Sequence, residues 1–200
     1  MKDIDLGIYP YVTSSNPLAA YAAVSAGIPA RLITDVTGVL KAFSSAVGAG
    51  PFPTEMEDNE AAALRGTGEH VDDEFGARTG RARRLGWLDL PAVRYAHLIN
   101  GFTELALCKL DKLDALPQIK VCTGYMLDGR EVADMPATRL LARVKPAYQT
   151  LPGWQSDTRG ARRIEDLPEN ARAYVRFIEA FIGVPVKYVG VGPGREEVAI

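Results

Sequence analysis

The stretch "LPENARAYVRFIEAFIGVPVKYVGVGPG", residues 167–194, decides the fold class. Four of its apolar side chains recur at the spacing of one helix face: Tyr174, Phe177, Ile178 and Phe181. Gly183 is of the type that ends helices, and the β-branched run 184–189 predicts a strand leading into a glycine-rich turn. An amphipathic helix joined to a strand is typical of α/β proteins.

The rest of the chain continues this alternation. Helices are expected over 17–27, 57–65 and 89–100, strands over 32–47, 103–111 and 118–127, an extended segment over 4–16 and a turn at 128–131. Asp89 is expected to cap the third helix, whose apolar side would hold Val93, Ala96 and Leu98. Because no repeat or linker interrupts the pattern, we predict one region over 1–200, an α/β fold with a mixed sheet and flanking helices.

Composition disfavours several classes of protein. The 23 basic and 25 acidic residues give a net charge of −2, so no overall field attracts nucleic acid or an anionic membrane. No apolar run approaches the roughly 20 residues of a membrane span, and "MKDIDLG" lacks the apolar core of a signal peptide. Two cysteines, Cys108 and Cys122, suit a reducing compartment, and we expect a cytoplasmic protein. His70 and His97 have no Ser or Cys partner at a telling spacing; we expect His97 to pack and His70 to form at most a minor hydrogen bond.

The run "EFGARTGRARR", residues 74–84, concentrates positive charge in one place. It carries Arg78, Arg81, Arg83 and Arg84 among two glycines and a threonine. A solvated basic loop and an anion-binding loop are about equally consistent with such a cluster taken alone. The planar guanidinium group suits an anion-binding loop, because it binds carboxylate and phosphate through two parallel hydrogen bonds.

Two polar motifs follow predicted strands. In "CKLD" (108–111), the carboxylate can accept from N1–H and the amine of guanine while the lysine stem lies on the purine. Taken alone, however, the four residues favour a plain surface Lys and Asp at a strand end. In "GVGPG" (190–194), backbone N–H groups can approach a ligand, but a plain tight turn has the same pattern. No G-x-x-x-x-G-K-[ST] phosphate loop is present in the sequence.

Taken together, six segments resemble the adenylosuccinate synthetase family, GTP-dependent ligases that join IMP to aspartate in the AMP branch of purine biosynthesis. They occur in the family's order: "YPYVTSSN" (9–16), "VGAGPFPTE" (47–55), "EFGARTGRARRLGWLD" (74–89), "CKLDKLD" (108–114), "LPGWQSDTRG" (151–160) and "VGPGRE" (191–196). The resemblance spans essentially the whole sequence and implies the C-terminal part of that fold.

The resemblance also implies roles for residues. The arginine loop would close over aspartate, and the set implied for aspartate and IMP is Thr13, Val47, Ala77, Arg78, Thr79, Gly80, Arg81, Ala82 and Arg83. Thr79 and Arg81 would hold aspartate, Arg81 would also reach the ribose, and Arg83 would lie nearer GTP. Thr13 would contact the IMP phosphate, with Val47 beside the ribose. The set implied for GTP is Arg83, Lys109, Leu110, Asp111, Gly190, Val191 and Gly192, while Arg84 is expected at the surface.

The sequence departs from the family at some of these positions. Arg78 stands where threonine is usual, Ala82 where arginine or proline is common, Cys108 in place of threonine, and Gly190 in place of a serine that bonds guanine. These departures bear on substrate geometry at Arg78 and on base affinity at Gly190.

The resemblance places the family's catalytic aspartate and histidine, phosphate loop and Mg²⁺ ligands in an N-terminal half that this sequence does not match. We therefore expect no catalytic residue and no metal ligand here, and a ligase part that is inactive alone. Its partners would be IMP, L-aspartate, GTP as substrate, a separate N-terminal half, and a second subunit of a homodimer. A stand-alone nucleotide- or dicarboxylate-binding module is the alternative. A nucleic-acid binder is disfavoured, because the basic residues lie in one loop without interleaved aromatics.

Overall fold

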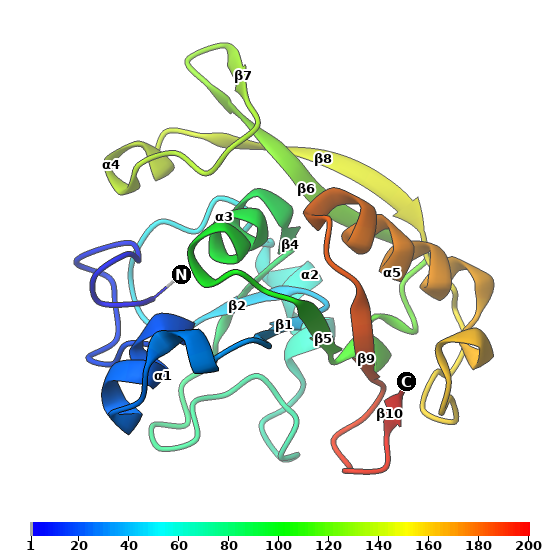
Figure 1. The fold of residues 1–200 in the computed structure, drawn as a ribbon. Helices are drawn as coiled ribbons and strands as arrows, with labels where there is room; N and C mark the ends of the chain where they lie inside the picture. The colour runs from blue at the N-terminus through cyan, green and yellow to red at the C-terminus, as the bar shows by residue number, and fades with distance from the viewer. Residues whose placement is uncertain (1) are drawn as a thin grey trace.

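A computed structural model describes residues 2–200 (Figure 1). Its central sheet has the strand order β1-β5-β9-β10, formed by β1 (Thr37–Lys41), β5 (Glu104–Cys108), β9 (Val186–Gly190) and β10 (Val198–Ala199). The first three strands are parallel and β10 is antiparallel to β9. The mixed α/β architecture predicted from the sequence is confirmed.

Two further sheets lie beside the central one. The long strand β6 (Gln118–Leu127) pairs with β4 (Leu88–Asp89) in parallel, and with β7 (Arg130–Val132) and β8 (Lys145–Pro152) antiparallel. In Figure 1 the β6–β7 hairpin projects away from the rest of the molecule. A two-stranded ribbon joins β2 (Ser44–Ala46) to β3 (Arg84–Gly86), so the strand after the arginine loop is anchored to the strand after β1.

The two longest helices pack against each other, with the Arg94 guanidinium 4.9 Å from the Phe181 ring centroid. They are α3 (Leu90–Asn100) and α5 (Glu169–Ile182). The predicted cap is present, since the Asp89 carboxylate accepts from Ala92 N–H at 3.2 Å. Gly183 ends α5 with φ of 79°. The Tyr174 hydroxyl donates to the carbonyl of Ala42 at 2.6 Å, which fixes α5 over the bend between β1 and β2.

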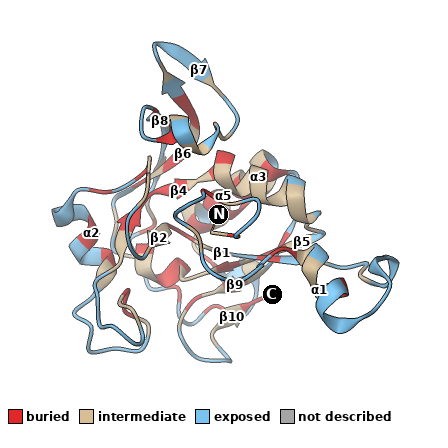
Figure 2. Cartoon of the chain, turned by 90° about the vertical axis from the view of Figure 1, so that its left-hand side faces the viewer, coloured by how far each residue is buried: buried red, intermediate tan, exposed pale blue. Residues whose placement is uncertain are grey.

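Smaller elements complete the chain. They are α1 (Ala19–Ala26), α2 (Asp58–Arg65), α4 (Thr138–Leu141) and the 3₁₀ turns η1 (Ala30–Leu32), η2 (Leu110–Leu113) and η3 (Ile164–Asp166). The main core lies between α5 and the central sheet, where Leu105, Leu107, Ile178 and Val189 are completely buried. Figure 2 places α1 and β7 at the exposed periphery. Among residues 2–200, no helix has the length and apolar character needed to cross a bilayer.

Several element predictions were wrong in detail. Residues 4–16 form turns in place of an extended segment, and the strand expected over 32–47 is two strands, because the chain bends at the buried pair Ala42 and Phe43. The strand expected over 103–111 ends at Cys108, since Lys109 adopts a left-handed φ of 63°. Leu98 is 72% exposed and does not belong to the apolar side of α3.

Candidate functional site

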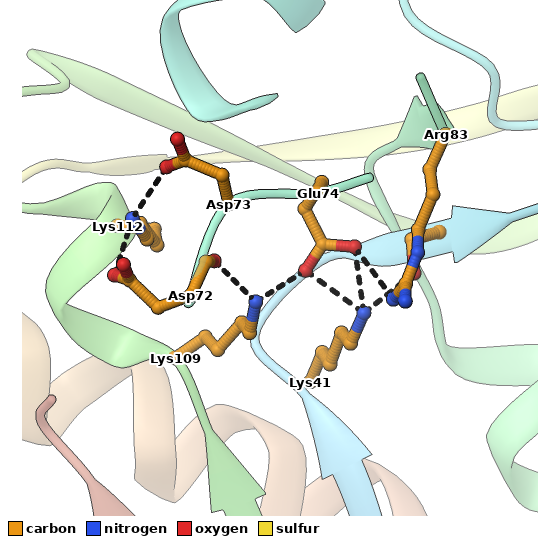
Figure 3. A network of polar contacts seen from close by, with 8 residues as sticks. Lys41, Asp72, Asp73, Glu74, Arg83, Lys109 and Lys112 are labelled. Carbon is orange, nitrogen blue, oxygen red and sulfur yellow. Dashed lines mark hydrogen bonds and ion pairs between the residues drawn. The ribbon is translucent and has the colours of Figure 1, made fainter. Parts of the chain in front are cut away.

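The candidate site lies at the carboxyl ends of two neighbouring parallel strands. Lys41 is the last residue of β1 and is paired in register with Cys108, the last residue of β5, which Lys109 follows. Ligands of open α/β sheets bind outside the carboxyl ends of the strands. The segment that begins at Asp72 and leads into the arginine loop crosses this edge (Figure 3).

A buried carboxylate, that of Glu74, occupies the centre of this edge. Its side chain is completely buried and accepts from three cations (Figure 3). Lys41 Nζ lies 2.9 and 2.8 Å from its two oxygens, Lys109 Nζ 2.5 Å from Oε1, and Arg83 Nη1 3.1 Å from Oε2. Lys109 also donates to the carbonyl of Asp72 at 2.7 Å. The sequence analysis did not identify Glu74 or Lys41.

The charges in this group shift each other's pKa values. Burial alone would raise the pKa of Glu74, but the hydrogen bonds from Lys109 and Lys41 outweigh it and hold the pKa at about 2. Burial lowers the pKa of Lys41, hydrogen bonding to Glu74 opposes this shift, and the like charges of Lys109 and Arg83 add to it. Three cations around one carboxylate leave a local surplus of positive charge, which favours an anionic ligand.

The arginine loop is a hairpin with an ordered stem. Gly76 N–H donates to the carbonyl of Arg81 and Gly80 N–H to the carbonyl of Gly76, both at 2.8 Å, and Phe75 pairs with Ala82. Gly80 has φ of 62°, a conformation that glycine adopts without strain. The tip, from Ala77 to Ala82, is exposed. Thr79, Arg78 and Arg81 therefore lie where an incoming ligand can reach them.

The four arginines differ in their contacts. Arg78 and Arg81 are exposed at the tip, whereas Arg83 is held by Glu74. The prediction that Arg84 is a surface member is wrong. Its guanidinium donates to both oxygens of Glu55 at 2.6 and 2.5 Å, and to the carbonyls of residues 48 and 50 at 3.1 and 3.0 Å. The side chain is 31% exposed.

The Lys-x-Asp motif and the glycine turn come together in space. Gly190, at the end of β9, lies beside β5: a Cβ added there would be 3.4 Å from Cys108 Cα. Leu110 and Val191 are completely buried, and Asp111 is 8% exposed. The Oδ2 atom of Asp111 is buried without a hydrogen-bond partner among the described residues. Burial raises the pKa of this carboxyl, against the opposing charge of Lys112.

The glycine turn is closed by a nearby carboxylate. Glu197 Oε2 accepts from Gly194 N–H at 2.6 Å, and the Glu197 carbonyl accepts from Val191 N–H at 2.9 Å. A Cβ at Gly192 would lie 2.5 Å from the Glu197 side chain, so a larger residue there would displace the carboxylate that bonds Gly194. The turn is thereby fixed next to the end of β5.

The segment 151–160 supports η2 from the other side. Asp114 accepts from Trp154 Nε1 at 2.6 Å, from Thr158 N–H at 2.8 Å and from the Thr158 hydroxyl at 3.0 Å. Gly153 passes so close that a Cβ there would meet the carbonyl oxygen of Leu116. These contacts hold the short 3₁₀ turn that carries Asp111.

The two remaining predicted residues, Thr13 and Val47, are exposed and are connected through one lysine. Thr13 N–H donates to the carbonyl of Lys2 at 2.8 Å, while Lys2 Nζ donates to the carbonyl of Val47 at 3.1 Å. The Thr13 hydroxyl shares a hydrogen bond of 2.6 Å with Ser15. Because Arg84 bonds the carbonyl next to Val47, this pair is also tied to the stem of the arginine loop.

Both histidines lie outside this arrangement. The His97 ring lies 6.0 Å from Phe102, as a packing residue does, and its Nδ1 is buried without a partner among the described residues. His70 donates its backbone N–H to Asp73. Within residues 2–200, no three His, Cys, Asp or Glu side chains are grouped as a metal site requires.

A second buried polar pair, not identified from the sequence, lies at the start of α3. The Tyr125 hydroxyl donates to Asp89 Oδ1 at 2.6 Å, and burial raises the pKa of Asp89. Both residues line a cavity of about 400 Å³ that also contacts Lys41 and Arg84. The signal in the sequence was the cap role of Asp89 alone, since its partner is 36 residues away.

Fold and site together define an α/β protein with a cationic edge at the ends of its parallel strands. The sequence model of the family described as adenylosuccinate synthetase matches residues 1–199, and the chain belongs to this family. Adenylosuccinate synthetase 1 of Methanosarcina acetivorans is 65% identical over 200 residues, covering 100% of this chain and 47% of the relative. Adenylosuccinate synthetase of Mycobacterium tuberculosis is 51% identical over 201 residues, covering 100% and 46%.

Solved structures agree with this assignment. The fully ligated adenylosuccinate synthetase of Plasmodium falciparum superposes with a TM-score of 0.92 at 34% identity, covering 100% of this chain and 47% of that one. A cyanophage S-2L succinoaminodeoxyadenylate synthetase has a TM-score of 0.56 at 18% identity over 98% of this chain and 42% of that one, a similarity that concerns the fold alone. The chain thus spans about half the length of the curated relatives it matches.

Proposed function

We propose that this chain forms the aspartate- and guanine-binding part of an IMP–aspartate ligase that uses GTP. The observation that carries the proposal is the buried, unpartnered Oδ2 of Asp111, held beside the Gly190–Gly192 turn in a member of this family. A buried carboxylate without a partner is costly, and a ligand that donates to it removes that cost.

Guanine suits the Asp111 carboxylate because it offers two donors on one edge, N1–H and the exocyclic amine. Hydrogen bonds to the charged form favour ionisation, so a bound guanine would oppose the upward pKa shift that burial causes. Lys109 is held by Glu74 and the Asp72 carbonyl, and its aliphatic stem would lie on the purine face. Leu110 and the backbone of Gly190, Val191 and Gly192 would line the remaining edge.

The dicarboxylate is proposed to bind at the tip of the arginine loop. Arg78 and Arg81 are exposed there and can each pair with a carboxylate through two hydrogen bonds, with the Thr79 hydroxyl beside them. Ala77, Gly80 and Ala82 shape the hairpin, and Arg83 at its stem would face the nucleotide. Thr13 and Val47, connected through Lys2, would contact IMP.

For the whole protein we propose the family reaction, in which GTP phosphorylates O6 of IMP and the amine of aspartate then displaces that phosphate. The catalytic aspartate and histidine, the phosphate loop and the Mg²⁺ ligands are proposed for the part of the relatives' length outside this chain. Mg²⁺ would neutralise phosphate charge there. We also propose that the whole protein is a homodimer that acts in the cytoplasm. Residues 1–200 would form a single C-terminal region of it.

The test is a chimera in which these 200 residues replace the matching segment of the Methanosarcina relative. Product formation from IMP, L-aspartate and Mg²⁺ is measured with GTP and with XTP. The unaltered chimera should turn over with GTP, and Asp111→Asn should prefer XTP, because the amide can donate to the 2-oxo group of xanthine. Losing a hydrogen bond to a charged group, about 1.5–3 kcal/mol, corresponds to a fall of about 10- to 150-fold in GTP affinity.

Asp128→Asn is the matched control, since this aspartate lies exposed in the β6–β7 turn. It should retain the preference for GTP. A chimera that forms no product with any nucleotide would contradict the proposed reaction, and an Asp111→Asn variant that still prefers GTP would contradict the guanine assignment. The 200-residue chain alone is expected to form no product under the same conditions.

A further inference from the structure

The group around Glu74 joins the two proposed binding regions through one side chain. Among residues 2–200, no other acidic residue is as deeply buried. One of its oxygens accepts from Lys109, two residues before Asp111, and the other accepts from Arg83, at the stem of the arginine loop (Figure 3). Lys41, from the end of β1, bonds both oxygens.

The backbone of Glu74 holds the same stem. Its carbonyl accepts from Arg83 N–H at 2.9 Å and its N–H donates to the carbonyl of Arg65 at 2.8 Å. Arg65 Nε in turn donates to the carbonyl of Arg83 at 3.0 Å. Glu74 therefore fixes the stem of the loop through its main chain and reaches the Lys109 ammonium through its side chain.

The charge balance makes this link responsive to ligands. Lys41, Arg83 and Lys109 share a single carboxylate, and Lys109 also donates to a second acceptor, the Asp72 carbonyl. A ligand that draws one cation toward itself leaves more of the carboxylate to the other two. Charges in such a shielded group are weakly screened, so each rearrangement is felt by the others.

We propose that Glu74 is a positioning residue that couples the guanine element to the arginine loop, so that guanine nucleotide and dicarboxylate each strengthen the binding of the other. This inference rests on the proposed function of the two regions. It adds a role that neither region has by itself, because Glu74 would touch neither ligand and would act through Lys109 and Arg83.

The test measures binding coupling in the chimera described above. The Kd of GDP is determined by titration calorimetry with and without saturating L-aspartate, and the ratio of the two values is the coupling factor. We expect a factor of about 5-fold or more for the unaltered chimera, within the usual range of coupling between sites. Glu74→Gln removes the charge and keeps the shape, and its factor should fall to within about 2-fold of unity.

The matched control is Glu55→Gln, which removes the carboxylate bound to Arg84 and leaves Lys109 and Arg83 untouched. Its coupling factor should equal that of the unaltered chimera. Glu74→Asp keeps the charge but cannot reach both Lys109 and Arg83, so its factor should be at most half that of the unaltered chimera. If Glu74→Gln does not fold, the coupling factor of Glu74→Asp tests whether the coupling passes through Glu74.

Three results separate the inference from the proposed function. If the unaltered chimera binds both ligands with a factor near unity, the inference is overturned and the binding sites stand. If Glu74→Gln or, where it does not fold, Glu74→Asp keeps the full factor, the coupling does not pass through Glu74. If the unaltered chimera binds neither GDP nor L-aspartate, the proposed function fails, and the inference with it.

Discussion

Replacing Arg84 by alanine should destabilise the fold, whereas replacing Arg78 should not. Arg84 makes a half-exposed ion pair with Glu55, worth about 0.5–1 kcal/mol. Its hydrogen bonds to two backbone carbonyls add about 1 kcal/mol each, reduced from the full value because the side chain is 31% exposed. Its position 5.4 Å from the Phe52 ring centroid adds about 0.5 kcal/mol. The sum is about 3 kcal/mol.

The assay is thermal and urea unfolding of Arg84→Ala and Arg78→Ala, each compared with the unaltered chain. For a protein of this length, about 3 kcal/mol corresponds to a fall in Tm of about 6–12 °C. Arg78→Ala, at the exposed tip, should stay within about 0.5 kcal/mol of the unaltered chain. Equal effects of the two substitutions would refute the reasoning, because the arginines would then act only as diffuse charge.

Three further outcomes are expected. In the chimera, Arg81→Ala should raise the KM for aspartate by about 30-fold or more, the effect of removing one partner of a desolvated charge pair, whereas an unchanged KM would remove Arg81 from the aspartate site. The pKa of Glu74 is about 2 in the folded chain, below its usual 4.5, so its ionisation stabilises the fold above about pH 4.5 and this stability is lost as the pH falls toward 2. Urea unfolding should show a loss of about 3 kcal/mol in the free energy of unfolding over this pH range, and Glu74→Gln should lack that loss. Parallel pH profiles of the two proteins would contradict this. Gly190→Ser fits without strain beside Cys108 and should raise guanine nucleotide affinity by about 2- to 10-fold in titration calorimetry, through one added hydrogen bond; weaker binding would indicate a clash.

The sequence predicted the elements whose signals are local. The amphipathic helix α5, the capped helix α3 and the strand β6 were all located, the last with both of its ends. β3, β4 and β10 were missed because two- and three-residue strands carry no periodic pattern. β8, although eight residues long, contains two prolines and has no fully buried residue. Their existence depends on pairing with other strands of the folded chain.

The site was predicted as a set of residues but not as an arrangement. The arginines could be named from their spacing, yet their separate environments depend on Glu55 and Glu74, which only the folded chain brings close. Glu74 itself looked like one more acidic residue in an acidic segment. Its burial follows from the pairing of neighbouring strand ends, which no local pattern encodes.

The proposed recognition of guanine by Asp111 is tested most directly by comparing GDP, IDP and ADP in one binding titration of the chimera. GDP offers N1–H and the exocyclic amine, IDP retains only N1–H, and ADP has no N1–H. Two donors to a buried carboxylate should give the order GDP, IDP, ADP, with steps of about 10-fold or more between them. The same order should disappear in Asp111→Ala. Equal affinity for the three nucleotides in the unaltered chimera would contradict the account.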